Sequence, residues 1–145
     1  MNKYIAFDFD GVICNSQYEC YRIAMEVFRD KFLLSTLSDK AFNNYYELFK
    51  QLRPFAYSGK DFIIIIYIIH YKYKIPTTID EYNNIMSEFS NSFEELEILF
   101  YLTREKYQKQ DFDKWLSWNK EYKNVVSSIS HQYEDLKYIY IVTTK

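Results

Sequence analysis

The 145-residue chain is long enough to form one compact domain with its own hydrophobic core. Apolar residues make up 48% of the chain and charged residues 26%, which is typical of a globular protein and excludes a disordered one. The formal net charge of −2 offers no basic field to hold nucleic acid, so we expect no nucleic-acid partner.

Cysteine content and apolar runs indicate the compartment. Two cysteines are too few for a disulfide framework. The chain reaches Asp8 before the apolar core of a signal peptide can form, which favours the cytoplasm. The most membrane-like run, 62–69, has eight residues, whereas a membrane-spanning helix needs about 20. We therefore expect no membrane partner.

The chain begins with a predicted strand. Residues 3–9 form a nearly continuous apolar run, typical of a strand covered on both faces in a parallel sheet. Asp8 and Asp10 lie at its C-terminal end, and Gly11 permits a sharp exit.

Helices are predicted for most of the remaining chain. From about Ser16 the apolar spacing becomes helical, and Ser38 can cap a second helix that Pro54 ends. The apolar run at 59–73 has β propensity, but its length without turn residues favours a buried helix. Capping-box patterns and apolar spacing predict further helices near 79–89, 93–109, 111–118 and 121–131.

A second apolar run, 136–142, predicts another strand and is followed by Thr143. A strand, a long helical stretch and a strand indicate an α/β fold in which a helical insert separates the first two parallel strands. We expect residues 1–15 and 135–145 to form part of the α/β core and residues 16–134 to form the insert. The chain is then mostly helical.

The two aspartates after the first strand indicate phosphoryl chemistry. Carboxylates two residues apart on an extended chain point to one face, and at the end of a parallel strand they reach the ligand-binding crevice. Asp8 can attack phosphorus, and Asp10 can exchange protons with the leaving group and water. Mg²⁺ would offset the repulsion between carboxylate and phosphate. Thr143 can donate a hydrogen bond to the phosphoryl group.

A D-x-D-G tetrapeptide also occurs in ordinary turns and in calcium loops. The later ligands of a calcium loop are absent after Gly11, and the preceding strand and following helix favour a catalytic loop. The ordinary turn remains an alternative on the sequence alone.

The segment 7–13, Phe-Asp-Phe-Asp-Gly-Val-Ile, resembles the first motif of the haloacid-dehalogenase-like (HAD) superfamily. The segment 139–145, Ile-Tyr-Ile-Val-Thr-Thr-Lys, resembles its second motif, and the stretch between them is similar to an all-helical cap. The resemblance implies a HAD-like Rossmannoid core and a cytoplasmic phosphatase that acts on a small phosphorylated metabolite through an aspartyl-phosphate.

The resemblance also implies roles for individual residues. Asp8 would be the nucleophile, Asp10 the general acid and base, and both would be Mg²⁺ ligands. Thr143 and Gly11 would bind the phosphoryl group. Arg53 is the cap residue best suited to contact substrate, because a guanidinium binds phosphate or carboxylate bidentately. Its alternative is a solvated charge at a helix end. An Asp at position 10 favours phosphatase over dehalogenase chemistry.

The chain departs from the HAD pattern in two ways. The basic third motif and the acidic fourth motif lie outside these residues, so we expect residues 1–145 alone to show little turnover. Asn15 stands where many capped phosphatases have Asp.

Two other functions stay open. A truncated, non-catalytic relative could act as an interaction module and self-associate through an uncovered sheet edge. A HAD phosphotransferase would use the same residues but pass the phosphoryl group to a hydroxyl other than water.

Overall fold

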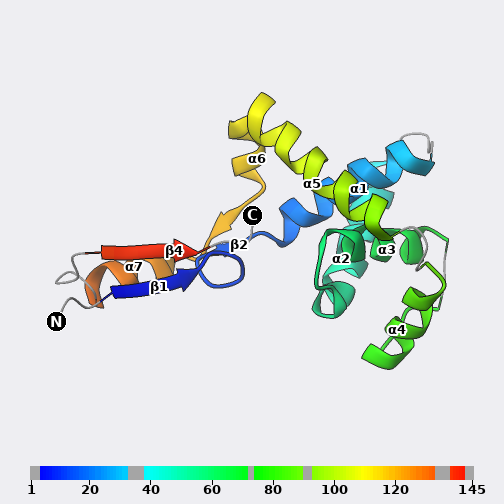
Figure 1. The fold of residues 1–145 in the computed structure, drawn as a ribbon, viewed down its shortest axis with the longest axis horizontal. Helices are drawn as coiled ribbons and strands as arrows, with labels where there is room; N and C mark the ends of the chain where they lie inside the picture. The colour runs from blue at the N-terminus through cyan, green and yellow to red at the C-terminus, as the bar shows by residue number, and fades with distance from the viewer. Residues whose placement is uncertain (1–3, 33–37, 72–73, 90–92, 133–137, 143–145) are drawn as a thin grey trace.

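The computed structural model describes residues 4–32, 38–71, 74–89, 93–132 and 138–142. Figure 1 shows an elongated molecule with a small sheet at one end and a helical body at the other. The elements are, in chain order, β1 (Tyr4–Asp8), β2 (Cys14–Asn15), α1 (Gln17–Phe32), α2 (Asp39–Leu52), η1 (Arg53–Phe55), α3 (Gly59–His70), α4 (Ile79–Ser87), α5 (Phe93–Gln110), α6 (Phe112–Ser117), β3 (Lys120–Glu121), α7 (Lys123–Gln132) and β4 (Tyr138–Val142).

The two predicted strands pair in parallel. Tyr4 lies opposite Tyr138 at one end of the register, and Asp8 lies opposite Val142 at the other. Strands that are adjacent and parallel need a crossover connection, which here is the entire helical body together with α7. The chain is therefore mostly helical with a small parallel sheet, as the sequence predicts.

A second, very short sheet joins the two ends of the molecule. β2 and β3 pair antiparallel, with Cys14 opposite Glu121 and Asn15 opposite Lys120. We call this pair of strands the neck, because the chain enters the helical body after β2 and leaves it before β3. Strands of two residues show no apolar alternation, so the sequence analysis did not predict them.

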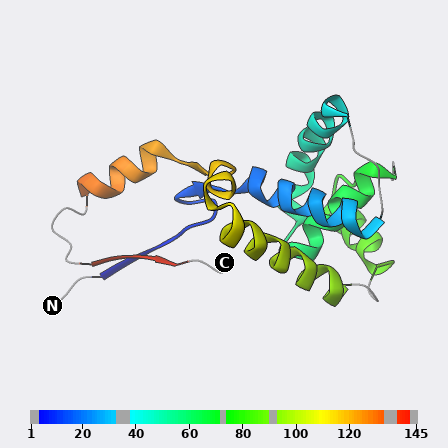
Figure 2. The same ribbon diagram turned by 90° about the horizontal axis from the view of Figure 1, so that it is seen from above.

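Helix α7 lies with the sheet and not with the helical body. Figures 1 and 2 both show α7 beside β1 and β4, on the far side of the neck from α1 to α5. The sequence analysis placed residues 123–132 in the insert because their spacing is helical. Periodicity identifies a helix but not the element it packs against.

The predicted helices are present close to their expected bounds. Ser38 caps α2 by accepting a hydrogen bond from the Ala41 amide at 3.3 Å. Thr78 caps α4 by accepting from the Glu81 amide at 3.2 Å. The cap expected at Ser92 lies outside the described residues. Helix α2 ends at Leu52, before Pro54 as expected. Pro54 itself lies in the short 3₁₀ turn η1, which follows α2 directly.

Helix α3 forms the centre of the core. It contacts α1, α2 and α5, and almost all of its side chains are buried, including Ile63, Ile64, Ile65 and Ile66. Burying one such side chain stabilises the fold by about 1.5–3 kcal/mol. A helix that is apolar on all sides must be enclosed by other helices, which explains why the 59–69 run folds as a central helix.

A buried ion pair connects the first and last helices of the body. The Arg104 guanidinium on α5 donates to both carboxylate oxygens of Glu19 on α1, at 2.7 and 2.8 Å. The indole Nε1 of Trp115 on α6 donates to the same carboxylate at 3.0 Å. All three side chains are buried, so the hydrogen bonds offset the cost of removing two charges from water.

Replacement of one partner of this pair should destabilise the protein strongly. We expect Glu19→Leu to lower the free energy of unfolding by about 3–5 kcal/mol, because it leaves the Arg104 charge buried without its partner. The double variant Glu19→Leu/Arg104→Met should recover most of the loss. Urea unfolding followed by circular dichroism measures both, and a single variant within about 1 kcal/mol of the parent would contradict a buried pair.

Gly59 allows the close approach of α3 to α5. A Cβ atom at this position would lie 2.6 Å from Cδ1 and 2.9 Å from Cβ of Phe100. The Cβ of Phe100 cannot move without its backbone, so rotation of the ring alone does not relieve the clash. Gly59 is the first residue of α3, and its lack of a side chain is required by this packing.

We therefore expect Gly59→Ala to lower the free energy of unfolding by about 1–3 kcal/mol through overpacking, although Ala is the better helix former. Lys60→Ala, at the next position of the same helix, is the matched control and should be close to neutral. Urea unfolding measures both. A stabilised Gly59→Ala would show that the two helices separate freely.

Candidate active site

The loop after β1 is a tight turn held by its own backbone. The carbonyl of Phe9 accepts hydrogen bonds from the amides of Ile13 and Cys14 at 3.1 and 2.9 Å, and the Gly11 amide donates to the Cys14 carbonyl at 2.8 Å. Gly11 adopts a φ of 79°, a left-handed conformation that disfavours other residues. The amide of Phe9 donates to the Val142 carbonyl at 3.0 Å, which attaches the start of the loop to β4.

This loop carries the two predicted catalytic aspartates. Asp8 is the last residue of β1 and is exposed, and Asp10 is half-buried in the turn. Both lie at the C-terminal end of a parallel strand, where α/β proteins bind ligands. The sequence analysis predicted this position.

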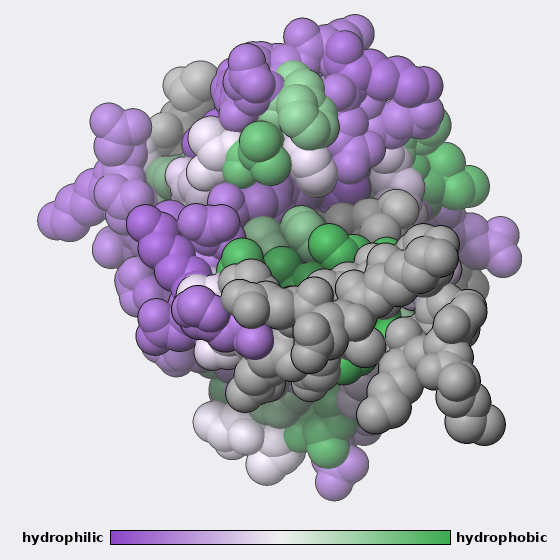
Figure 3. All heavy atoms as spheres, turned by 90° about the vertical axis from the view of Figure 1, so that its left-hand side faces the viewer, coloured by the Kyte–Doolittle hydropathy of each residue, from purple (hydrophilic) through white to green (hydrophobic). Residues whose placement is uncertain are grey.

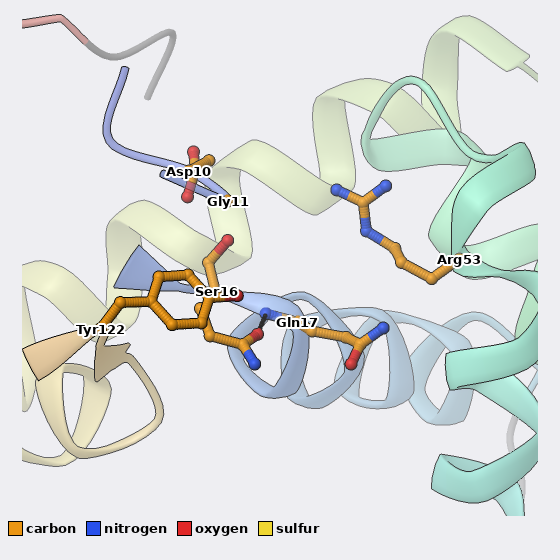
Figure 4. Close-up of a pocket in the computed structure, with 7 residues that line it drawn as sticks. Asp10, Gly11, Ser16, Gln17, Arg53 and Tyr122 are labelled. Atoms are coloured by element: carbon orange, nitrogen blue, oxygen red, sulfur yellow. Dashed lines mark hydrogen bonds between the residues drawn. The ribbon is translucent and has the colours of Figure 1, made fainter. Parts of the chain in front are cut away.

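A cavity of about 230 Å³ lies between the loop and the helical body. It is lined by Asp10, Gly11, Asn15, Ser16, Gln17, Arg53 and Tyr122 (Figure 4). We call it the Asp10–Arg53 pocket. It brings together three of the predicted site residues, Asp10, Gly11 and Arg53, which are far apart in the sequence. Asp8 does not line this pocket, and Thr143 lies outside the described residues.

Arg53 is held in place and is not a free charge at a helix end. Its Nη1 donates to the Ala56 carbonyl at 3.1 Å, and its guanidinium lies 4.6 Å from the centre of the Phe62 ring. Figure 4 shows the guanidinium reaching from the helical body toward the loop of Asp10 and Gly11. A guanidinium has five N–H donors, so this arrangement leaves donors for an anion in the pocket.

The N-terminus of α1 forms another wall of the pocket. The Asn15 side-chain oxygen accepts a hydrogen bond from the Gln17 amide at 3.0 Å, which orders the first turn of the helix. The positive end of the helix dipole therefore lies beside the pocket, where it favours an anion. Arg53 and this helix end are the positive counterparts to the carboxylate of Asp10.

Some lining residues were not identified from the sequence. Ser16 and Gln17 were read only as the start of a helix, although Asn-Ser before a helical period is an N-cap signal. Tyr122 reaches the pocket because its amide donates to the Ile13 carbonyl at 2.9 Å beside the neck. No local sequence signal predicts that long-range contact.

The donor set suits a hard cation in part. Among the described residues, no group of three His, Cys, Asp or Glu side chains is placed to hold a metal ion. Mg²⁺, however, is commonly bound by one or two carboxylates, with water and substrate phosphate as its other ligands. Asp8 would provide a carboxylate for such a site and Asp10 its backbone carbonyl, and both oxygen atoms match the preference of Mg²⁺.

Comparison of the chain with protein-family models, with curated proteins and with solved structures found no match. In the part of the chain that the structure describes, no helix is both long enough and apolar enough to cross a membrane.

The role of Asn15 as a cap can be measured. We expect Asn15→Ala to lower the free energy of unfolding by about 0.5–2 kcal/mol, because the Gln17 amide loses its acceptor. Asn15→Asp keeps an acceptor at the same place and is the matched control, with stability near that of the parent. Equal stability of all three proteins in urea unfolding would show that the bond contributes nothing.

Proposed function

We propose that this chain carries the nucleophile loop and the helical cap of a Mg²⁺-dependent HAD-type phosphohydrolase that acts on a small phosphorylated metabolite. The observation that carries the proposal is the pocket in which Asp10 and Gly11, on the loop after β1, face Arg53 of the helical body. A carboxylate loop opposite a guanidinium and a helix N-terminus suits a phosphoryl group.

Each residue has a defined part in the proposed reaction. Asp8 lies outside the lining of the pocket, at the end of β1 two residues before Asp10. It would attack phosphorus at the edge of the pocket to form an aspartyl-phosphate while the substrate oxygen leaves. Asp10 protonates that oxygen and then accepts a proton from the attacking water. Arg53 and the backbone of Gly11 hold the phosphoryl oxygens. Mg²⁺ bound at Asp8 and Asp10 would supply positive charge that reduces the repulsion between nucleophile and phosphate.

The size and position of the pocket support a small substrate. A volume of about 230 Å³ between the loop and the helical body is sufficient for a small phosphorylated group. The pocket lies between the loop and Arg53 of the helical body, so a phosphoryl group in it would contact both the nucleophile loop and a positive charge. The same residues serve a phosphotransferase, in which a second hydroxyl takes the place of water.

Beryllium trifluoride, which mimics a phosphoryl group on a carboxylate, tests the assignment of Asp8. In the presence of Mg²⁺ we expect a bound ¹⁹F resonance with the parent protein. Asp8→Asn should abolish it, because the amide cannot form the bond. Asp10→Asn is the matched control and should retain it, since Asp10 transfers protons and does not attack. A bound resonance that persists in Asp8→Asn would show that another residue is the nucleophile.

A non-catalytic interaction module is the second candidate function, and the exposure of β4 favours it. Tyr140, Ile141 and Val142 are each more than half exposed, with relative accessibilities of 51%, 58% and 55%. Consecutive residues of a strand point to opposite faces, so apolar groups are exposed on both faces of β4. Figure 3 views this end of the molecule and shows apolar residues at its surface.

This second function predicts self-association. The parent protein should elute from gel filtration as a dimer or larger species that dissociates on dilution, because a paired sheet edge buries these side chains. Ile141→Glu should elute as a monomer, and Ile98→Glu, at an exposed position on α5, is the matched control that should not change the elution. A monomeric parent at all concentrations would contradict self-association and count against the module.

A further inference from the structure

A second cavity lies beside the Asp10–Arg53 pocket. It has a volume of about 280 Å³ and is lined by Asn15, Tyr18, Tyr46, Ser117 and Lys120. We call it the tyrosine cavity. Asn15 lines both spaces, so the two cavities are neighbours. A substrate whose phosphoryl group occupies the first pocket can therefore extend into the second.

Lys120 provides a positive charge in the tyrosine cavity. It lies directly opposite Asn15 in the neck, so its side chain is on the same face of this small sheet as that of Asn15. Glu121, the next residue, points to the opposite face and does not neutralise it. No ion pair of Lys120 with another described residue is found.

Two tyrosines form walls of the tyrosine cavity and add a hydrogen-bond donor beside that charge. The rings of Tyr18 and Tyr46 pack edge to face with their centres 5.1 Å apart, and both side chains are half-buried. Burial raises the pKa of the Tyr46 hydroxyl, which therefore stays neutral and available as a donor. Lys120 itself is exposed, so its charge stays hydrated and an ion pair with it provides a modest gain in affinity.

Other charges near the cavity do not cancel that of Lys120. The Lys50 ammonium lies 5.2 Å from the centre of the Tyr46 ring, but it is paired with Glu47 at 2.6 Å. The Arg22 guanidinium, one turn after Tyr18 on α1, lies over the rings of Phe42 and Trp118. Lys50 and Arg22 thus add positive charge near the cavity, and the carboxylate of Glu47 is already paired with Lys50.

We propose that the tyrosine cavity binds a second anionic group of the substrate, either a carboxylate or a second phosphate, through Lys120. The substrate class is then a phosphomonoester whose alcohol part carries a negative charge a few bonds from the ester oxygen. This inference rests on the proposed function, because it takes the phosphoryl group to lie in the Asp10–Arg53 pocket.

Binding of three matched probes to the 145-residue protein tests the proposal. Isothermal titration in the presence of Mg²⁺ would compare propyl phosphate, 3-phosphonooxypropanoate and 1,3-propanediol bisphosphate, which share a three-carbon chain. We expect the two probes with a second anion to bind about two- to fivefold more tightly, as one exposed ion pair provides. Whichever of these two probes binds more tightly shows whether the cavity prefers a carboxylate or a phosphate as the second group.

Variants connect that preference to Lys120. Lys120→Gln should remove the preference and leave binding of propyl phosphate unchanged, whereas Lys120→Arg should keep the preference. Lys106→Gln, an exposed lysine on α5 that lines neither cavity, is the matched control and should change nothing.

The outcomes distinguish the two proposals. Equal binding of all three probes, or a preference that survives in Lys120→Gln, overturns the role of the tyrosine cavity and leaves the phosphate pocket intact. Absence of binding by any probe overturns the phosphate pocket and the tyrosine cavity together.

Discussion

The pairing of β2 with β3 is the constraint on which the rest of the molecule depends. This neck of two residue pairs connects the sheet to the whole helical body. Because the chain enters and leaves the body at the same point, the N-terminus of α1 is held beside the loop of Asp10. Asn15 and Tyr122, at or next to the paired strands, then become walls of the pocket.

The buried pair of Glu19 and Arg104 makes that arrangement rigid. Glu19 lies in the first turn of α1, directly after the neck. Arg104 and Trp115 lie on α5 and α6, the last helices before the chain returns to it. The two halves of the insert that adjoin the neck are thus joined by charge-assisted hydrogen bonds. This connection keeps the body, and with it Arg53, in a fixed relation to the neck.

Much of the architecture could be predicted from the sequence, because it follows from local signals. The apolar run before Asp8 is itself sufficient to predict β1, and Ser38 with the residues that follow it is sufficient to predict the start of α2. The long isoleucine run is specified as a helix by its length and lack of turn residues. Local reasoning placed Asp10 and Gly11 on one loop, whereas Arg53 was selected as a substrate contact from the resemblance to a helical cap and the chemistry of its guanidinium; the pocket brings these three together.

The features that could not be predicted are those that join distant residues. The neck pairs positions 14–15 with 120–121, and strands this short have no pattern to detect. The ion pair of Glu19 with Arg104 looks, in the sequence, like two ordinary surface charges on amphipathic helices. Lys120, Tyr18 and Tyr46 are far apart in the sequence, and only the fold brings them together in the second cavity. The neck, the buried ion pair and the second cavity all depend on tertiary contacts, which local sequence patterns do not predict.

The central claim is that Asp8 accepts a phosphoryl group, and chemical trapping tests it most directly. The protein would be incubated with Mg²⁺ and acetyl phosphate, quenched in acid and reduced with borohydride, which converts an aspartyl-phosphate into homoserine. Peptide mass spectrometry then locates the modified residue. The account predicts homoserine at position 8 and an unchanged Asp10. Homoserine at another position, or a chain without any, would contradict it.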